Sequence, residues 1–175
     1  MKILLVITGL GVGGAEKLVT ALADRFVCEG HTVMLVSLTG VVDIRPKNQS
    51  VLLEELGIEK SSVKTFVGLL RLRELILNFQ PDVINSHLFH ANIITRLIRF
   101  FVRMNRLISS AHSPNEEGRA RMFAYRLTDR LADISTNVSE EAVRAFEQER
   151  AVAPGRMVIV HNGIDCTAFS FSSAA

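Results

Sequence analysis

Residues 2–38, KILLVITGLGVGGAEKLVTALADRFVCEGHTVMLVSL, decide the fold. The segment begins with a continuous apolar run over residues 2–8, which is typical of a strand buried on both faces in a parallel sheet. A glycine-rich turn over residues 9–14 follows, and apolar residues then recur at helical spacing as far as Gly30. Residues 31–38 form a second apolar run, so the pattern predicts a strand, a tight turn, a helix and a second strand, which is a βαβ unit.

The alternation of strand and helix continues along the rest of the chain. Helices are predicted over residues 69–79, 94–101 and 120–131 and after Ser139, and strands over residues 82–86, 107–111, 133–136 and 157–160. Ser139 is a good N-cap, and Glu140 and Glu141 follow it in the first turn, where acidic residues are favourable. Residues 40–64 are ambiguous and fit a surface loop, a short helix over residues 51–56 or an edge strand. The alternation predicts an α/β protein with a Rossmann-like, doubly wound, mostly parallel sheet.

Length and composition favour one soluble domain. The 175 residues suit one domain, and a hydrophobic fraction of 48% is ample for a buried core. We expect residues 1–168 to form this domain and residues 169–175 to be a tail or the start of an interdomain linker, as in a fragment of a longer protein. A net charge of +2 gives no reason to expect a nucleic-acid partner. No secretory signal is visible, and the widely separated Cys28 and Cys166 predict free thiols in a reducing cytoplasm.

The glycine-rich turn satisfies G-x-G-x-x-G through Gly9, Gly11 and Gly14, and it lies between a predicted strand and a predicted helix. Such a turn lets the backbone approach a phosphate, which the free N–H groups of the helix N-terminus can bind. A tight turn with no ligand remains an alternative. A dinucleotide site also requires an acid at the end of the second strand, but the first acid after that strand is Asp43, and Arg45 lies too far along the chain to replace it. NAD(P) binding therefore stays only as an alternative.

Polar residues follow most of the predicted strands at their carboxyl ends, where open α/β sheets bind ligands. They are Ser37, Thr39, Asn85, Ser86, His87, His112, Ser113, Asn137, His161, Asn162 and Gly163. These groups suit a hydroxyl-rich or phosphorylated ligand. His87 and His90 have the spacing H-x-x-H, but no third ligand is evident, so we do not expect a metal site. His87 also fits a polar residue that caps a strand, and His112 a loop histidine satisfied by the backbone.

Three arginines, Arg96, Arg99 and Arg103, fall on one side of their predicted helix. The opposite side carries Ile94, Leu97, Ile98 and Phe101, which are expected to face the core. The arginines fit either an ordinary solvated helix face or a surface that contacts anionic lipid headgroups.

The chain resembles the N-terminal domain of the large retaining GT-B glycosyltransferases called family 4, or glycosyl transferases group 1. The resemblance is carried by several short segments spread along most of the chain. They are G-G-A-E at residues 13–16, P-D-V-I at 81–84, H-L-F-H at 87–90, A-H-S at 111–113, N-V-S-E at 137–140 and H-N-G-I-D at 161–165. The first and last of these, in this order and at this distance, are the most specific.

The resemblance implies two Rossmann-like lobes that face each other across a cleft. The C-terminal lobe, absent here, would hold most of the nucleotide-sugar site, and the N-terminal lobe would mainly recognise the acceptor. The sugar would be transferred with retention of configuration and without a cofactor or an essential metal ion. His112 matches the family histidine near the transferred sugar and is the expected catalytic residue. The expected substrate-binding residues are Gly11, Gly13, Gly14, His87, Ser113 and Asn162, with Gly13 and Gly14 near the donor diphosphate.

The expected partners are a nucleotide sugar, a saccharide or lipid-linked acceptor, the missing C-terminal lobe and an anionic membrane surface. The expected location is the cytoplasm, with peripheral attachment to the inner face of the cytoplasmic membrane. Because the second lobe is missing, we expect the chain to be inactive alone. A non-catalytic subunit that binds the acceptor or recruits a partner to the membrane remains an alternative.

Overall fold

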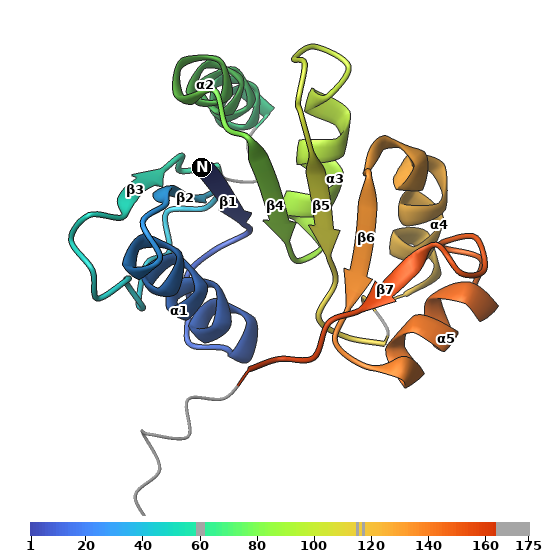
Figure 1. Ribbon diagram of the computed structural model, residues 1–175. Helices are drawn as coiled ribbons and strands as arrows, with labels where there is room; N and C mark the ends of the chain where they lie inside the picture. The colour runs from blue at the N-terminus through green and yellow to red at the C-terminus, as the bar shows by residue number, and fades with distance from the viewer. Residues whose placement is uncertain (59–61, 115, 117, 164–175) are drawn as a thin grey trace, which may run out of the picture.

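The computed structural model describes residues 1–58, 62–114, 116 and 118–163. In this part of the chain seven strands form one all-parallel sheet in the order β3-β2-β1-β4-β5-β6-β7 (Figure 1). The strands are β1 (Lys2–Ile7), β2 (Thr32–Ser37), β3 (Leu52–Glu55), β4 (Val83–His87), β5 (Leu107–Ser110), β6 (Ile134–Asn137) and β7 (Met157–Ile159). The helices are α1 (Gly14–Cys28), α2 (Ser62–Phe79), α3 (Phe89–Ile98), α4 (Arg119–Thr128) and α5 (Glu140–Gln148), with a 3-10 turn, η1 (Asp129–Leu131). The predicted doubly wound α/β fold is confirmed.

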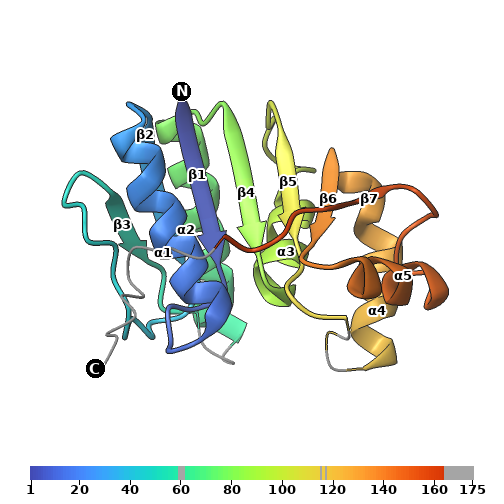
Figure 2. The same cartoon turned by 60° about the horizontal axis from the view of Figure 1, so that its bottom comes forward.

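The helices cover both faces of the sheet. Figure 2 shows α1 in front of β1 and β2, with α2 and α3 behind the sheet. The apolar side chains of β1 alternate between these faces, so Leu5 packs under α1 with Val19, whereas Leu4 packs under α2 with Leu72. A third cluster joins α4 and α5, with Phe146 fully buried at its centre. This double covering explains why the strands are continuous apolar runs in the sequence.

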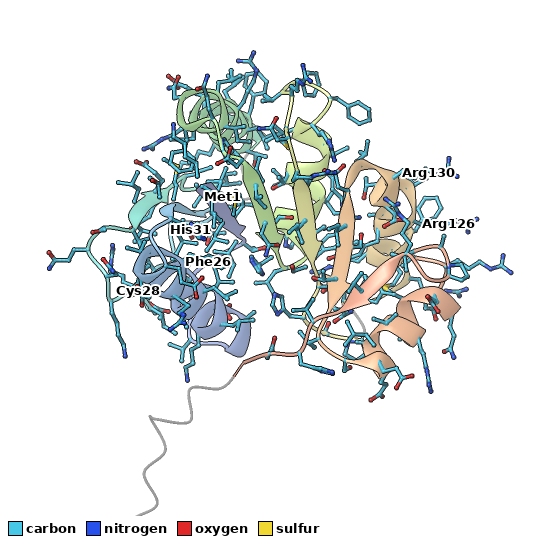
Figure 3. All side chains as sticks on the ribbon, viewed as in Figure 1. Met1, Phe26, Cys28, His31, Arg126 and Arg130 are labelled. Atoms are coloured by element: carbon cyan, nitrogen blue, oxygen red, sulfur yellow. The ribbon has the colours of Figure 1, made fainter. Side chains whose placement is uncertain are left out.

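The ends of the helices follow the local sequence. Gly30 adopts a φ of +82° just after α1, a conformation that favours glycine, and it turns the chain back towards β2. Ser139 is the N-cap of α5, because its Oγ accepts a hydrogen bond from the Ala142 N–H at 3.2 Å. Cys28, the last residue of α1, is a free and exposed thiol (Figure 3), and Cys166 lies outside the described residues.

The ambiguous segment 40–64 contains an edge strand and not the short helix over residues 51–56. β3 pairs in parallel with β2, with Met34 opposite Leu52, and this pairing satisfies backbone groups that an isolated helical turn would leave to solvent. The helix predicted over residues 69–79 begins earlier, at Ser62. No described helix is long and apolar enough to cross a membrane.

The three arginines expected on one face of a helix do not form a solvent-facing stripe, and this expectation is wrong, because α3 ends at Ile98 and only Arg96 lies on it. Arg96 is fully buried, and its guanidinium donates hydrogen bonds at 3.1–3.2 Å to the hydroxyls of Ser109, Thr128 and Ser135. Arg99 donates to the Leu131 carbonyl and to the carboxylate of Asp133. Arg103 alone among the three is exposed.

The apolar side of α3 also differs from the prediction, because two of its four residues face solvent. Leu97 is 44% exposed and Phe101, just after the helix, is 74% exposed, whereas Ile98 is buried and Ile94 half-buried. Helical periodicity identified an amphipathic helix but not which side faces the core.

Candidate functional site

A pocket of about 680 Å³ lies at the carboxyl ends of the strands, where α1 and α3 begin. Its walls come from the start of α1 (Gly14, Ala15, Glu16), the start of α3 (Leu88, Phe89, His90), the segment after β5 (His112, Ser113, Glu116), and Thr8, Arg121 and Asn162. Parallel strands end at the same edge of a sheet, as the arrowheads in Figure 2 show, so residues far apart in the sequence meet here.

The glycine-rich turn forms one wall of the pocket, and its backbone does not adopt the left-handed conformation that would require glycine. None of Gly9, Gly11, Gly13 and Gly14 has a positive φ. A Cβ atom at Gly9 would lie 2.7 Å from Thr39 Oγ1, so a packing contact explains this glycine. A Cβ at Gly14 would meet nothing within 4 Å, and Gly14 lines the pocket. Close approach of a ligand is therefore the better explanation for Gly14.

The structure brings an acidic residue to the same turn. A parallel bridge between Leu10 and Val42 holds the segment after β2 against the turn, and the Asp43 N–H donates to the Leu10 carbonyl at 2.8 Å. A Cβ atom at Gly11 would lie 3.9 Å from a carboxylate oxygen of Asp43. Glu16 brings a second carboxylate to the turn, against Gly13, and lines the pocket together with Gly14, so both sides of the turn carry negative charge.

Two helix N-termini that lack a capping side chain line the pocket, those of α1 and α3. Their N-cap residues are Gly13 before α1 and Leu88 before α3, and neither provides a side-chain capping hydrogen bond. Leu88 has a φ of +71°, a strained conformation for a residue with a Cβ. The first N–H groups of a helix carry partial positive charge, so this arrangement favours an anionic ligand.

Two histidines form a neutral pair beside the pocket. Nδ1 of His87 and Nε2 of His112 are 3.0 Å apart, and the two rings are tilted by 34°. The pKa of His87 is lowered to about 3, mainly by burial and to a smaller extent by the nearby His112. Burial also lowers the pKa of His112. His87 Nε2 and His112 Nδ1 are buried and have no hydrogen-bond partner among the described residues.

A buried polar network supports the strand ends below the pocket. Asn92 is its centre: its amide nitrogen donates to the Ser110 carbonyl at 3.0 Å and to the Tyr125 hydroxyl at 2.9 Å. The Ser86 hydroxyl donates to the Asn92 amide oxygen at 2.7 Å. Because each partner comes from a different element, the network holds α3 and α4 against the sheet in one arrangement.

Most of the predicted site residues lie around this pocket. Gly14, His112, Ser113 and Asn162 line it directly. Gly11 and Gly13 belong to the same turn without lining the pocket. His87 lies behind His112, 2% exposed, and borders a second, smaller cavity of about 120 Å³ instead.

Sequence reasoning did not identify Glu116 and Arg121 as pocket residues. Arg121 lies over the ring of Phe89 at 4.9 Å, and Glu116 is buried. Both belong to the loop and helix start that follow β5, so the end of that strand was the available signal. His90 is exposed while His87 is buried, and the described residues contain no group of three or more potential metal ligands.

Comparison with known proteins places the chain in a family. Glycosyltransferase Family 4 matches residues 12–168. No curated protein matches the sequence closely enough to be compared.

Several solved structures share the fold. A glycosyltransferase from Rickettsia africae aligns over 95% of this chain and 44% of its own, with 14% identity and a TM-score of 0.77. Anabaena HepE in complex with UDP-glucose aligns over 95% of this chain and 45% of its own, with 17% identity and a TM-score of 0.71. The lipopolysaccharide outer core galactosyltransferase WaaB aligns over 94% and 46%, with 13% identity and a TM-score of 0.71.

These matches assign the fold to one Rossmann-like lobe of GT-B enzymes, because the chain spans under half the length of each of these proteins. The family match covers most of the chain. The chain therefore belongs to Glycosyltransferase Family 4 and corresponds to the N-terminal domain of such a glycosyltransferase.

Proposed function

We propose that this chain is the acceptor-side lobe of an enzyme that transfers a sugar from a nucleotide-sugar donor to a saccharide or lipid-linked acceptor. The observation that carries the proposal is the single pocket that joins the start of α1 to His112. The family membership supports the reaction class, and the homologous HepE binds UDP-glucose. A second lobe would supply the rest of the donor site, so the isolated chain is expected to bind weakly and not to turn over.

In the proposed reaction, an acceptor hydroxyl oxygen forms a bond to the anomeric carbon as the bond from that carbon to the diphosphate breaks. The hydroxyl proton leaves with the nucleoside diphosphate, and the configuration of the anomeric carbon is retained. The start of α1 at Gly14 would face the diphosphate with its free N–H groups. His112 would contact the transferred sugar, with Ser113 and Asn162 lining the same space. Neither a cofactor nor a metal ion is part of this proposal.

The donor side is tested with a matched pair of variants, Gly14→Asp and Gly14→Asn. The two side chains have similar size and enter open space, so both variants should fold. Aspartate at the first position of α1 favours the helix electrostatically, yet its charge opposes a diphosphate. We expect Gly14→Asp to bind UDP-glucose about ten-fold more weakly than Gly14→Asn, measured by NMR titration of the backbone amides of the turn.

Two outcomes of this titration would contradict the proposal. Equal affinities of the two variants would mean that no diphosphate approaches Gly14. Saturable low-micromolar binding of NAD(H) or NADP(H), centred on residues 9–14 and without any response to UDP- or GDP-sugars, would instead support an oxidoreductase domain.

An apolar groove supports a second proposal, that the enzyme works at the anionic cytoplasmic face of a membrane. The groove, about 450 Å³, lies between α2 and α3, and its rim includes Phe66 and Phe101, which are 62% and 74% exposed. Arg73 lines it, Arg103 follows Phe101 by two residues in the chain, and residues 89–106 contain no acid. Exposed aromatic side chains beside basic residues suit the interface of an anionic bilayer.

Vesicle sedimentation tests this location. Phe66→Ser with Phe101→Ser should abolish binding to vesicles that contain anionic lipid. Phe123→Ser, which changes a similarly exposed phenylalanine on α4 outside the groove, should leave binding unchanged. Equal binding by the double variant and by Phe123→Ser would contradict the membrane proposal. A concentration-dependent dimer that forms in the wild type and is lost in the double variant would instead assign the groove to self-association.

A further inference from the structure

The histidine pair joins a rigid residue to a loop residue. His87 is the last residue of β4, where its backbone is paired with Ile7 of β1 on one side and with Ser110 of β5 on the other. Its side chain is 2% exposed. His112 follows β5 in the loop that lines the large pocket, and it is only half-buried. Of the two rings, that of His87 is therefore the one whose position the sheet determines.

The contact between the rings also couples their protonation. Both rings are neutral at neutral pH, because burial disfavours the charged form of each. A neutral imidazole has one N–H donor and one acceptor nitrogen. A hydrogen bond between Nδ1 of His87 and Nε2 of His112 therefore needs a proton on one of these two atoms and not on the other. The tautomer of His87 decides whether Nδ1 of His112 is a donor or an acceptor.

The pair leaves one nitrogen of His112 for a ligand. Nε2 is engaged by His87, so Nδ1 alone can bond a sugar hydroxyl or a phosphate oxygen while the pair stays intact. Nδ1 is buried, so the loop that carries His112 must adjust when a ligand binds. A ligand group that needs a hydrogen-bond donor would bind one tautomer of His112, and a group that needs an acceptor would bind the other.

We propose that His87 is a positioning residue, which holds His112 through the Nδ1–Nε2 contact and so selects the tautomer and orientation that His112 presents to the donor sugar. The inference rests on the proposed function, in which His112 contacts the donor. It assigns to His87 no direct contact with substrate. This role accounts for a buried polar side chain at a strand end that borders the smaller cavity and not the large pocket.

The test compares His87→Asn with His87→Leu in the ¹⁵N-histidine-labelled chain. The asparagine amide nitrogen lies near the position of histidine Nδ1 and keeps a hydrogen-bonding group there, whereas leucine fills similar space without one. Long-range ¹H–¹⁵N spectra report the tautomer of each ring. We expect one tautomer of His112 in the wild type and in His87→Asn, and a mixture of both in His87→Leu.

A ligand titration adds a readout that a structural role alone would not change. We expect His87→Leu to weaken the UDP-glucose response of His112 by about three- to ten-fold, the size of one lost hydrogen bond, and His87→Asn to restore most of it. His31 serves as the control for folding, because it lies beside Phe26 before β2 and away from the pocket (Figure 3). Its signals should be the same in all three proteins.

The outcomes separate this inference from the proposed function. A single, unchanged tautomer of His112 in His87→Leu, with His31 unaltered, would overturn the positioning role. If UDP-glucose moved neither His112 nor the amides of the glycine turn in the wild type, the proposed function would fail. The tautomer comparison would still decide whether His87 controls His112.

Discussion

Acidification should destabilise this protein through His87, and the expected size follows from its burial. The side chain ordinarily titrates at 6.5, but burial and the neighbouring His112 lower its pKa to about 3 in the folded protein. Above pH 6.5 neither the folded nor the unfolded state binds the proton, so His87 causes no pH dependence there. Between pH 6.5 and 3 the unfolded chain binds a proton that the folded chain does not, so stability falls as pH falls.

The magnitude at pH 5.0 is about 2 kcal/mol, because the unfolded pKa lies about 1.5 units above that pH and each unit corresponds to about 1.36 kcal/mol. This is a large part of the 5–15 kcal/mol that is typical of a whole domain. Urea unfolding followed by circular dichroism at pH 7.5, 6.0 and 5.0 measures the change. The variant His87→Asn has no titrating group at this position and serves as the reference.

We expect the wild type to lose about 2 kcal/mol more than His87→Asn between pH 7.5 and 5.0. His112, whose pKa is also lowered by burial, contributes in the same direction in both proteins. Its contribution largely cancels in the comparison. Parallel stability curves for the two proteins over this range would refute the reasoning, because they would mean that His87 can take up a proton in the folded state.

Three further substitutions test the packing that holds the site. Arg96→Met leaves three buried hydroxyls without their donor and should lower the free energy of unfolding in urea by roughly 3 kcal/mol. The control variant Arg103→Met, at an exposed position, should change it by less than about 0.5 kcal/mol. Equal urea midpoints for the two variants would contradict the buried role of Arg96. Gly68→Ala makes a new Cβ clash with Ile58 Cγ1 and should cost about 1–3 kcal/mol. If this clash is the cause, the loss should be smaller when Ile58→Ala is already present. Ser139→Ala removes the N-cap of α5 and should lower the thermal midpoint by an amount equivalent to about 1 kcal/mol, and an unchanged midpoint would show that the cap is energetically unimportant.

Much of the fold could be predicted from the sequence because its strands are buried on both faces. The apolar runs of β1 and β2 and the glycines between them indicated a parallel α/β sheet without reference to any other element. The ambiguity of the sequence at β3 has the same physical origin. This short edge strand, L-L-E-E, is only partly buried, so its sequence carries neither a continuous apolar run nor a clear alternation.

The position of the site could be predicted from the sequence, but only some of the residues that line it could. Carboxyl ends of parallel strands meet at one edge, and this rule alone led to His112, Ser113 and Asn162. Glu116 and Arg121 were missed because they lie beyond the strand ends, where the path of the loop determines what reaches the pocket.

Apart from β3, the sequence by itself therefore determined the order of strands and helices along the chain, the glycine turn and the edge at which ligands bind, since these depend on local periodicity and on topology. Only the tertiary structure decided that Arg96 is buried, that Asp43 lies beside Gly11 and that His87 lies behind His112. Each of these results depends on contacts between side chains far apart in the chain, 25 residues for the histidines and 39 for Arg96 and Ser135. Periodicity reports which faces of an element differ, but the partners that a polar side chain finds across the fold determine which face is buried.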